Sequence, residues 1–400
     1  MRYTYNFPTT IRFGAGVIDE LADHLKANNI AKPLLVTDSI VVQLDFFKKI
    51  KKDLAAKNIH ADVFYDMHKN PVKSDVLRGT DIFRNTNCDC AIGIGGGVAM
   101  DVARAIVLKA NHYEDLFYYD DLIGGDKYVT NEVPYFITIP TTSGTGSEVG
   151  RSAIIGDEIT LPSPTGEGPV RRTPDSFGGV RSHQKKILFS PKLLAKIAFC
   201  DPMLTMDLPP FVTAATGMDA LTHNLEAFLA KMYHPICEGI ALEGISLITK
   251  SIERAVNKPD TDSRSMMMLG STMGAIAFQK GLGVVHSLAH PLSSLLDTHH
   301  GLANAVNLPY GMSFNIEGCE EKFRRIAKTI GLEKENGQTV VDYLFQLNKN
   351  IGLPAKLSGI GVKKEHIETL SDLAFADFCH PNNPKPVTKE DFKKLYLEAL

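Results

Sequence analysis

The chain has 400 residues, with 43 Lys and Arg against 46 Asp and Glu, so its formal net charge at pH 7 is −3. This length exceeds one ordinary hydrophobic core and suits two domains. The balanced charge lacks the basic excess that is typical of nucleic-acid-binding proteins. Hydrophobic residues make up 44% and charged residues 22% of the chain, a composition that excludes global disorder.

Neither a membrane segment nor an export signal is recognisable in the sequence. No apolar run approaches the roughly 18 residues that a membrane-spanning helix needs, and residues 1–7 lack the apolar core of a secretory signal. The six cysteines are scattered, without the spacing of a zinc ribbon or a redox CxxC pair. We therefore expect reduced, buried cysteines in a cytoplasmic protein that acts without a nucleic acid or a membrane.

Short β-rich runs alternate with helical patterns over the first half of the chain. Apolar runs at 33–38, 90–94 and 135–139 predict buried strands, and apolar residues at helical spacing predict helices over 18–27 and 98–110. This alternation is typical of an α/β domain, with a mostly parallel sheet that helices cover on both faces.

Helical patterns follow one another in the second half, and Gly and Pro mark the joints between them. We expect helices over 211–230, 236–256, 263–280, 320–330, 340–350 and 389–399. The sequence therefore predicts an α/β domain over residues 1–200 and an all-helical domain over residues 201–400. One segment departs from this scheme, because residues 161–180 contain four Pro and four Gly and predict a long irregular loop.

Three consecutive glycines, Gly95, Gly96 and Gly97, follow the second predicted strand and precede a helix. Glycine lets the backbone approach a ligand without a Cβ in the way, and the free N–H groups at the start of a helix favour a phosphate. Thr141 and Thr142 follow the third predicted strand and offer hydroxyl groups, so the two loops suit a cofactor crevice. The GxGxxG fingerprint is incomplete at Val98, and plain tight turns are the alternative.

Asp38 closes the first predicted strand. A carboxylate at this position accepts hydrogen bonds from a ribose diol and repels a 2′-phosphate, so it favours NAD over NADP. The alternative is that Asp38 only caps the start of the following helix.

Five of the 13 histidines fall in two short segments of the second half. Asp219 and His223 are four residues apart on a helical stretch and therefore share one face, and His286 and His290 repeat that spacing. His299 and His300 follow ten residues later. One carboxylate with three imidazoles suits Fe²⁺ or Zn²⁺ better than Ca²⁺ or Mg²⁺. Surface or capping positions are the alternative.

Several motifs resemble those of the iron-containing (group III, metal-dependent) alcohol dehydrogenase family, and the resemblance runs over nearly the whole chain. The motifs are Gly95-Gly96-Gly97-x-x-x-Asp101, Pro140-Thr141-Thr142-x-Gly144-Thr145-x-x-Glu148, Ala215-Thr216-Gly217-Met218-Asp219-Ala220-Leu221-x-His223, Gly281-x-x-x-x-His286-x-x-x-His290-Pro291-Leu292 and Asn383-Pro384-Lys385. The resemblance implies a dinucleotide-binding α/β domain, a helical metal-binding domain and an active site in the cleft between them. The implied reaction is the reversible, NAD(P)-dependent oxidation of an alcohol to an aldehyde or ketone.

The family's functional residues carry over to named positions of this chain. The implied metal ligands are Asp219, His223, His286 and His300, whereas His290 matches a histidine near the nicotinamide that does not bind metal. The implied cofactor residues are Asp38, Gly95, Gly96, Gly97, Asp101, Thr141 and Thr142. We expect a small alcohol or aldehyde as substrate and a homodimer or larger homo-oligomer. Two departures are Val98, where the family usually has Ser, and residues 161–180, which replace what looks like a short hairpin.

Other interpretations stay open at this point. The chain resembles dehydroquinate synthases and glycerol-1-phosphate dehydrogenases more weakly, and a catalytically silent metal-binding protein on the same scaffold is a further alternative. His290 is a candidate proton relay, because the pKa of histidine lies in the useful range, or only a packing residue. A cluster of basic residues suggests an acidic substrate, if it reaches the cleft, or a solvated loop; it comprises Arg151, Arg171, Arg172, Arg181, Lys185 and Lys186.

Overall fold

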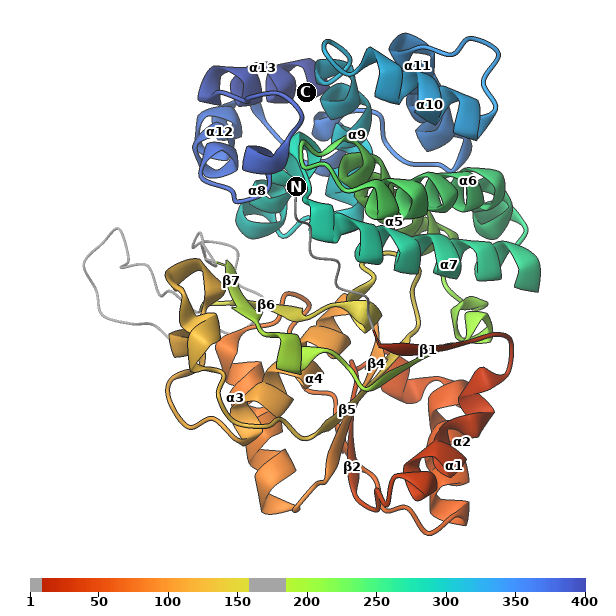
Figure 1. Cartoon of the computed structure of the whole chain (residues 1–400), viewed down its shortest axis with the longest axis vertical. Helices are drawn as coiled ribbons and strands as arrows, with labels where there is room; N and C mark the ends of the chain where they lie inside the picture. The colour runs from red at the N-terminus through yellow and green to blue at the C-terminus, as the bar shows by residue number, and fades with distance from the viewer. Residues whose placement is uncertain (1–8, 158–184) are drawn as a thin grey trace.

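The computed structural model describes residues 9–157 and 185–400. Its main feature is a six-stranded sheet in which every neighbouring pair of strands is parallel, in the order β1-β8-β5-β4-β2-β3 (Figure 1). The strands are β1 (Thr10–Phe13), β2 (Pro33–Val36), β3 (Asp62–Phe64), β4 (Cys90–Gly95), β5 (Tyr135–Pro140) and β8 (Ile197–Cys200). The predicted mostly parallel sheet and the three predicted strands are confirmed.

Helices cover both faces of this sheet, because its central strands are apolar on both sides. Leu34 packs with α3 (Lys73–Asn85) and α4 (Gly97–Ala110) on one face. The next residue, Leu35, packs with α1 (Leu21–Ala27) and α2 (Asp45–Ala56) on the other face. Figure 1 shows α3 and α4 on one side of the strands and α1 and α2 on the other. Side chains that alternate along a strand thus build two separate cores.

A two-stranded antiparallel hairpin, β6 (Ser152–Gly156) with β7 (Lys185–Phe189), lies beside the sheet. These two strands were not predicted from the sequence, because they are short and their pairing joins segments far apart in the chain. The predicted loop at 161–180 itself lies outside the described residues.

Residues 201–400 form helices and connecting segments without a strand, so the predicted all-helical character is confirmed. The helices are α5 (Pro210–Leu229), α6 (Pro235–Asn257), α7 (Thr261–Ala277), α8 (Val284–Leu296), α9 (His300–Phe314), α10 (Glu320–Ile330), α11 (Gly337–Asn350), α12 (Ile367–Phe375) and α13 (Lys389–Ala399). They enclose one large apolar core. The boundary near residue 200 stays a prediction.

One predicted helix differs from the structure at a glycine-rich joint. The helix predicted over 263–280 ends at Ala277 and is followed by a 3₁₀ turn, Phe278–Lys280. The next helix begins only at Val284, because Gly281 has φ 119° and Gly283 also has a non-helical backbone. A positive φ of this size suits glycine and interrupts a helix.

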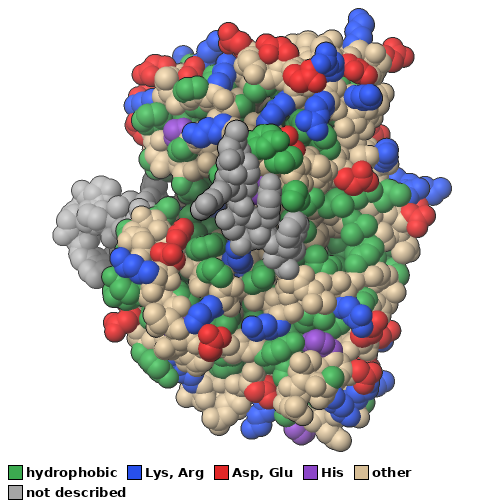
Figure 2. Space-filling view, in the orientation of Figure 1, with side chains coloured by type: hydrophobic (Ala, Val, Ile, Leu, Met, Phe, Trp, Pro, Cys, Tyr) green, Lys and Arg blue, Asp and Glu red, His purple; other side chains and the backbone are tan. Residues whose placement is uncertain are grey.

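The visible surface carries charges of both signs. On the face in Figure 2, Lys and Arg side chains are interspersed with Asp and Glu. Within residues 9–157 and 185–400, no helix combines the length and the apolar character needed to cross a bilayer.

Candidate metal and cofactor site

The four predicted metal ligands lie together inside the helical half. Asp219 and His223 come from α5, His286 from α8 and His300 from the first position of α9. One ligand atom from each residue lies within 4.8 Å of all the others. Residues up to 81 positions apart in the chain thus form one compact donor set.

The three imidazoles surround one carboxylate oxygen. Oδ1 of Asp219 lies 3.4 Å from Nε2 of His300 and 4.0 Å from Nε2 of both His223 and His286. The rings of His223 and His286 stack with their centroids 4.7 Å apart. The Nε2 atoms of the three rings therefore converge on the same point as Asp219.

Burial controls the protonation of these histidines. It lowers the pKa of His223 to about 4, and together with His290 and His286 it lowers the pKa of His300 well below its ordinary value. Burial also lowers the pKa of His286, but the hydrogen bond and charge of Glu226 outweigh it and raise that pKa. Neutral imidazoles keep the lone pair that a metal requires. The donor set therefore fits a borderline divalent cation.

Two further polar residues form hydrogen bonds with the predicted ligands, and neither was predicted from the sequence. Glu226 Oε2 accepts a hydrogen bond from Nδ1 of His286 over 2.6 Å, which leaves Nε2 of that ring facing the donor set. Nδ2 of Asn304 lies 2.7 Å from Oδ1 of Asp219 and 3.2 Å from Nε2 of His300. Their spacing could have indicated them, because Glu226 follows His223 by three residues and Asn304 follows His300 by four, and such residues share a helix face.

His290 and His299 lie outside the converging donor set. Nδ1 of His290 is 2.7 Å from Oδ2 of Asp377, and the His290 ring stacks on His300 at 5.4 Å between centroids. His299 precedes α9, and its Nδ1 accepts a hydrogen bond from the backbone N–H of Leu302. No local sequence pattern pointed to Asp377, which lies 87 residues after His290.

The predicted cofactor residues gather at the carboxyl ends of three adjacent strands, β2, β4 and β5. The backbone N–H of Thr141 donates to the carbonyl oxygen of Gly95 over 3.0 Å. Oγ1 of Thr142 lies 3.6 Å from the position that a Cβ on Gly96 would take, and Oδ2 of Asp38 lies 3.7 Å from the equivalent position on Gly95. This edge of a parallel sheet is where nucleotides bind in doubly wound folds.

The three glycines of the turn differ in how much space a side chain would have at each position. Gly95 has φ 151°, and a Cβ on it would lie 2.8 Å from Cβ of Ala99. A Cβ on Gly97 would lie 2.8 Å from Cγ2 of Thr145. Gly96, which caps α4, has no atom closer than 3.6 Å to its Cβ position. Packing thus demands Gly95 and Gly97, whereas Gly96 leaves its backbone open.

Asp38 and Asp101 both bond to the protein itself. Oδ1 of Asp38 accepts hydrogen bonds from the backbone N–H groups of Ile40 and Val41, each over 2.8 Å, so the capping role is present. Asp101 accepts hydrogen bonds through both carboxylate oxygens, from Arg104, Ser147 and the backbone N–H of Ile154. The cofactor contacts of Asp38 and Asp101 stay predictions.

The threonine loop, residues 140–148, packs on α5, which carries Asp219 and His223, and on the neighbouring helix α7. A Cβ on Gly144 would lie 2.8 Å from Cβ of Thr216, which precedes Asp219 by three residues on α5. Oε1 of Glu148 accepts a hydrogen bond from Oγ1 of Thr272 on α7 over 2.8 Å. The edge of the sheet that carries the predicted cofactor residues therefore lies next to α5, the helix of Asp219 and His223.

Among the described residues of the basic cluster, Lys185 interacts electrostatically with one member of the donor set, Asp219. The strongest opposite charges on its ammonium are those of Asp377, Asp101 and Asp219, and burial lowers its pKa. Lys186 pairs with Asp120 over 3.4 Å, and Arg151 lies over the ring of Phe189. Arg171, Arg172 and Arg181 fall outside the described residues.

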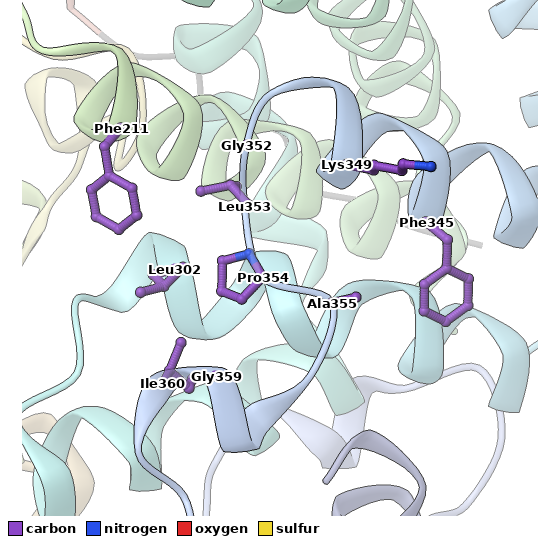
Figure 3. Close-up of a pocket in the computed structure, with 10 residues that line it drawn as sticks. All are labelled: Phe211, Leu302, Phe345, Lys349, Gly352, Leu353, Pro354, Ala355, Gly359 and Ile360. Carbon is purple, nitrogen blue, oxygen red and sulfur yellow. The ribbon is translucent and has the colours of Figure 1, made fainter.

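An open groove of about 650 Å³ lies elsewhere in the helical half (Figure 3). It is formed by the starts of α5 and α9, the end of α11 and the segment that follows α11. No predicted metal or cofactor residue lines it; its lining residues are Phe211, Leu302, Phe345, Lys349, Gly352, Leu353, Pro354, Ala355, Gly359 and Ile360.

Comparisons with known proteins match both halves of the chain to one family. Residues 8–161 match the model for iron-containing alcohol dehydrogenases, and residues 213–400 match the model for the C-terminal part of the same family. The chain is 34% identical to a 4-hydroxybutyrate dehydrogenase of Cupriavidus necator, over 100% of both sequences. It is 31% identical to the lactaldehyde reductase of Escherichia coli K12, over 98% of this chain and 97% of that one.

Solved structures agree with this relationship. The crystal structure of a 1,3-propanediol oxidoreductase superposes with a TM-score of 0.90 at 28% identity, covering 100% of both chains. A sulfoacetaldehyde reductase from Bifidobacterium kashiwanohense, in complex with NAD⁺, superposes with a TM-score of 0.85 at 25% identity, covering 100% of this chain and 99% of that one. These matches do not favour the alternatives of a dehydroquinate synthase, a glycerol-1-phosphate dehydrogenase or a silent protein. The chain belongs to the iron-containing alcohol dehydrogenase family and is an oxidoreductase that acts on an alcohol–aldehyde pair.

Proposed function

We propose that this enzyme transfers hydride between NAD(H) and a small alcohol–aldehyde pair, with a divalent metal, Fe²⁺ or Zn²⁺, held by Asp219, His223, His286 and His300. The observation that carries the proposal is the convergence of these four ligand atoms within 4.8 Å beside the threonine loop. When bound, the metal supplies Lewis-acid polarisation of the substrate oxygen, and the nicotinamide accepts or donates the hydride.

The chain's own residues bind and orient the reactants. The open backbone of Gly96 and the first N–H groups of α4 would hold the pyrophosphate of a bound dinucleotide, and Thr141 and Thr142 line the same edge. Asp38 uses Oδ1 for its cap and keeps Oδ2 for a ribose diol, which favours NAD over NADP. His290 holds its Nδ1 against Asp377 and presents Nε2 as the proton acceptor during alcohol oxidation.

The substrate is a small polar aldehyde or the corresponding alcohol. Relatives named for 4-hydroxybutyrate, lactaldehyde and sulfoacetaldehyde support this size and polarity. A second candidate is an aldehyde whose tail carries a carboxylate. The observation that favours it is Lys185, a partly buried ammonium on β7 that interacts electrostatically with Asp219 and Asp377, because a cation beside the site gains from an anionic partner.

The state of the cysteines bears on the cellular compartment of the enzyme. All six cysteines are free, which favours a reducing compartment such as the cytoplasm. A homodimer or larger homo-oligomer is the assembly that the family relationship favours.

The test is a metal-dependent assay on the purified chain. The protein is stripped of metal, reloaded with Fe²⁺ or Zn²⁺, and assayed for NADH oxidation with neutral and carboxylate-bearing aldehydes of matched length. We expect turnover only with metal, and none in His223→Ala. Turnover without metal, or none with either metal and any aldehyde, contradicts the proposal.

Lys185→Met tests the acidic substrate separately. If Lys185 binds the carboxylate, this variant raises KM for the carboxylate-bearing aldehyde at least about tenfold, the loss of one charge-assisted contact, and leaves KM for the neutral aldehyde unchanged. A loss of NADH affinity, or equal effects on both aldehydes, contradicts this second candidate.

A further inference from the structure

Two histidines on α8 each pair with a buried carboxylate from another segment. Nδ1 of His286 contacts Glu226, and Nδ1 of His290, one helical turn later, contacts Oδ2 of Asp377 over 2.7 Å. Asp377 follows α12, and its side chain is 9% exposed. His286 belongs to the converging donor set, whereas His290 does not. The Asp377 carboxylate therefore bonds to a histidine that is not a predicted metal ligand.

The Asp377 carboxylate is itself fixed by the protein. Its Oδ1 accepts hydrogen bonds from Oγ of Ser287 over 2.7 Å and from the backbone N–H of Cys379 over 2.9 Å. The hydroxyl oxygen of Ser287 in turn accepts from the backbone N–H of His380 over 2.9 Å. Burial raises the pKa of Asp377, but His290 and these donors outweigh it and hold that pKa below its ordinary value. The carboxylate is therefore ionised and immobile.

The ring of His290 is held at Nδ1 and packs against two other rings. Because an ionised carboxylate only accepts hydrogen bonds, Asp377 fixes the proton of neutral His290 on Nδ1. The ring contacts His300 and Phe378 at centroid distances of 5.4 and 5.6 Å. Its Nε2 has no hydrogen bond to the residues that the structure describes, and the side chain is 19% exposed. The free lone pair of His290 thus points away from Asp377.

A second metal site at His290, Asp377 and Cys379 is the rival interpretation, since their ligand atoms also lie within 4.8 Å of one another. Metal binding requires a thiolate and two free lone pairs. Burial raises the pKa of Cys379 well above its ordinary value, and Oδ2 of Asp377 is already bonded to Nδ1 of His290. These groups therefore fit a hydrogen-bonded pair better than a ligand set.

We propose that Asp377 is a positioning residue that acts through His290, by fixing its Nδ1–H tautomer and aiming Nε2 at the substrate hydroxyl. During alcohol oxidation Nε2 would accept the hydroxyl proton, and a bound oxidised nicotinamide would supply the acceptor for the hydride of the carbinol C–H bond. The resulting imidazolium shares its Nδ1–H with the Asp377 carboxylate and then releases the Nε2 proton to water. This inference rests on the proposed function and deepens it.

The tautomer is measured first, without reference to activity. The Zn²⁺-loaded protein is labelled with ¹⁵N-histidine, and the His290 signals are assigned by their loss in His290→Gln. We expect a protonated Nδ1 and an unprotonated Nε2 in the wild type, and a loss of this preference in Asp377→Asn. A wild-type His290 protonated on Nε2 instead of Nδ1 overturns the inference.

Kinetics then separate positioning from general structural support. Asp377→Asn lowers kcat for aldehyde reduction about 10²-fold, the scale of one acid–base contribution, with KM, NADH affinity and metal content unchanged. Asp377→Glu, which keeps the carboxylate, recovers at least about a tenth of the wild-type rate. Asp372→Asn is the matched control, because Asp372 is an exposed carboxylate on α12, and it retains full activity.

A double-mutant cycle tests whether Asp377 acts through His290. In a His290→Ala background, Asp377→Asn changes kcat less than about threefold, since residues that act as a unit are not additive. An equal loss in both backgrounds, or loss of metal from Asp377→Asn, overturns the inference. If His290→Ala alone keeps full kcat, the proton relay in the proposed function fails, and the tautomer measurement still decides whether Asp377 positions the ring.

Discussion

Glu226 and His286 are 60 residues apart in the chain, yet Oε2 of Glu226 lies 2.6 Å from Nδ1 of His286 and both side chains are 1% exposed. Oε1 of the same carboxylate accepts the backbone N–H of Val285 over 2.7 Å at the start of α8. One buried carboxylate thus fixes the start of a helix and the orientation of the metal donor that this helix carries.

Glu226→Gln therefore lowers metal affinity about 10- to 100-fold, the usual cost of losing a carboxylate behind a metal-binding histidine. The amide still accepts the N–H of Val285, so α8 keeps its cap. Competition with a chelator of known affinity measures the change. Glu243→Gln, at an exposed position on α6, is the matched control. Equal metal affinity in both variants contradicts a role for Glu226 in the metal site.

The adjacent histidines His299 and His300 separate into two roles. His300→Ala removes a donor of the converging set, so we expect the purified variant to lose its metal and nearly all turnover. His299→Ala keeps the metal and loses at most about 1 kcal/mol of stability, because it removes a weak helix cap. Metal content of the two proteins decides between them. The assignment is wrong if His299→Ala loses the metal and His300→Ala retains it.

Asp38 accepts hydrogen bonds from the backbone at Ile40 and Val41 and also carries a negative charge. Two substitutions separate the effects of the hydrogen bonds and of the charge. Asp38→Asn keeps an oxygen for the N–H groups of Ile40 and Val41 but removes the charge that repels a 2′-phosphate. We expect it to lower the ratio of kcat/KM for NADH to that for NADPH at least about tenfold, as expected for losing one charge repulsion, with unchanged Tm.

Asp38→Gly also relaxes cofactor preference and loses only roughly a few tenths of a kcal/mol of stability with the cap, because Gly is itself tolerated at a helix start. A wild-type enzyme that uses NADPH better than NADH would falsify this role for Asp38.

Gly96 and Gly97 are adjacent but differ in what surrounds them. A Cβ on Gly96 meets nothing within 3.6 Å, so Gly96→Ala keeps the free energy of unfolding within about 0.5 kcal/mol. The same Cβ obstructs the backbone that faces the pyrophosphate, and we expect the Kd for NADH to rise at least about tenfold.

Gly97→Ala is the contrasting variant, because its Cβ lies 2.8 Å from Cγ2 of Thr145 and overpacking costs about 1–3 kcal/mol. Thermal unfolding and NADH titration of both proteins give the comparison. Normal NADH binding by Gly96→Ala shows that the turn does not hold the pyrophosphate.

The sequence by itself determined the local elements and the identity of the chemistry. The apolar runs that form β2, β4 and β5 are readable because buried parallel strands need apolar side chains on both faces. The spacing of Asp219 and His223 is readable because residues four apart share a helix face. These signals depend only on neighbours along the chain, and the family motifs added the remaining ligands, His286 and His300.

Only the tertiary structure decided which distant residues meet. Glu226 reaches His286 across 60 residues and Asp377 reaches His290 across 87, and these contacts depend on how α5, α8 and the segment after α12 pack. The hairpin of β6 and β7 likewise pairs strands from either side of residues 158–184. A carboxylate gives the same local sequence signal whether it lies in solvent or behind a metal-binding histidine. Its role depends on its burial and on its hydrogen-bond partner, and both are set by the packing of distant segments.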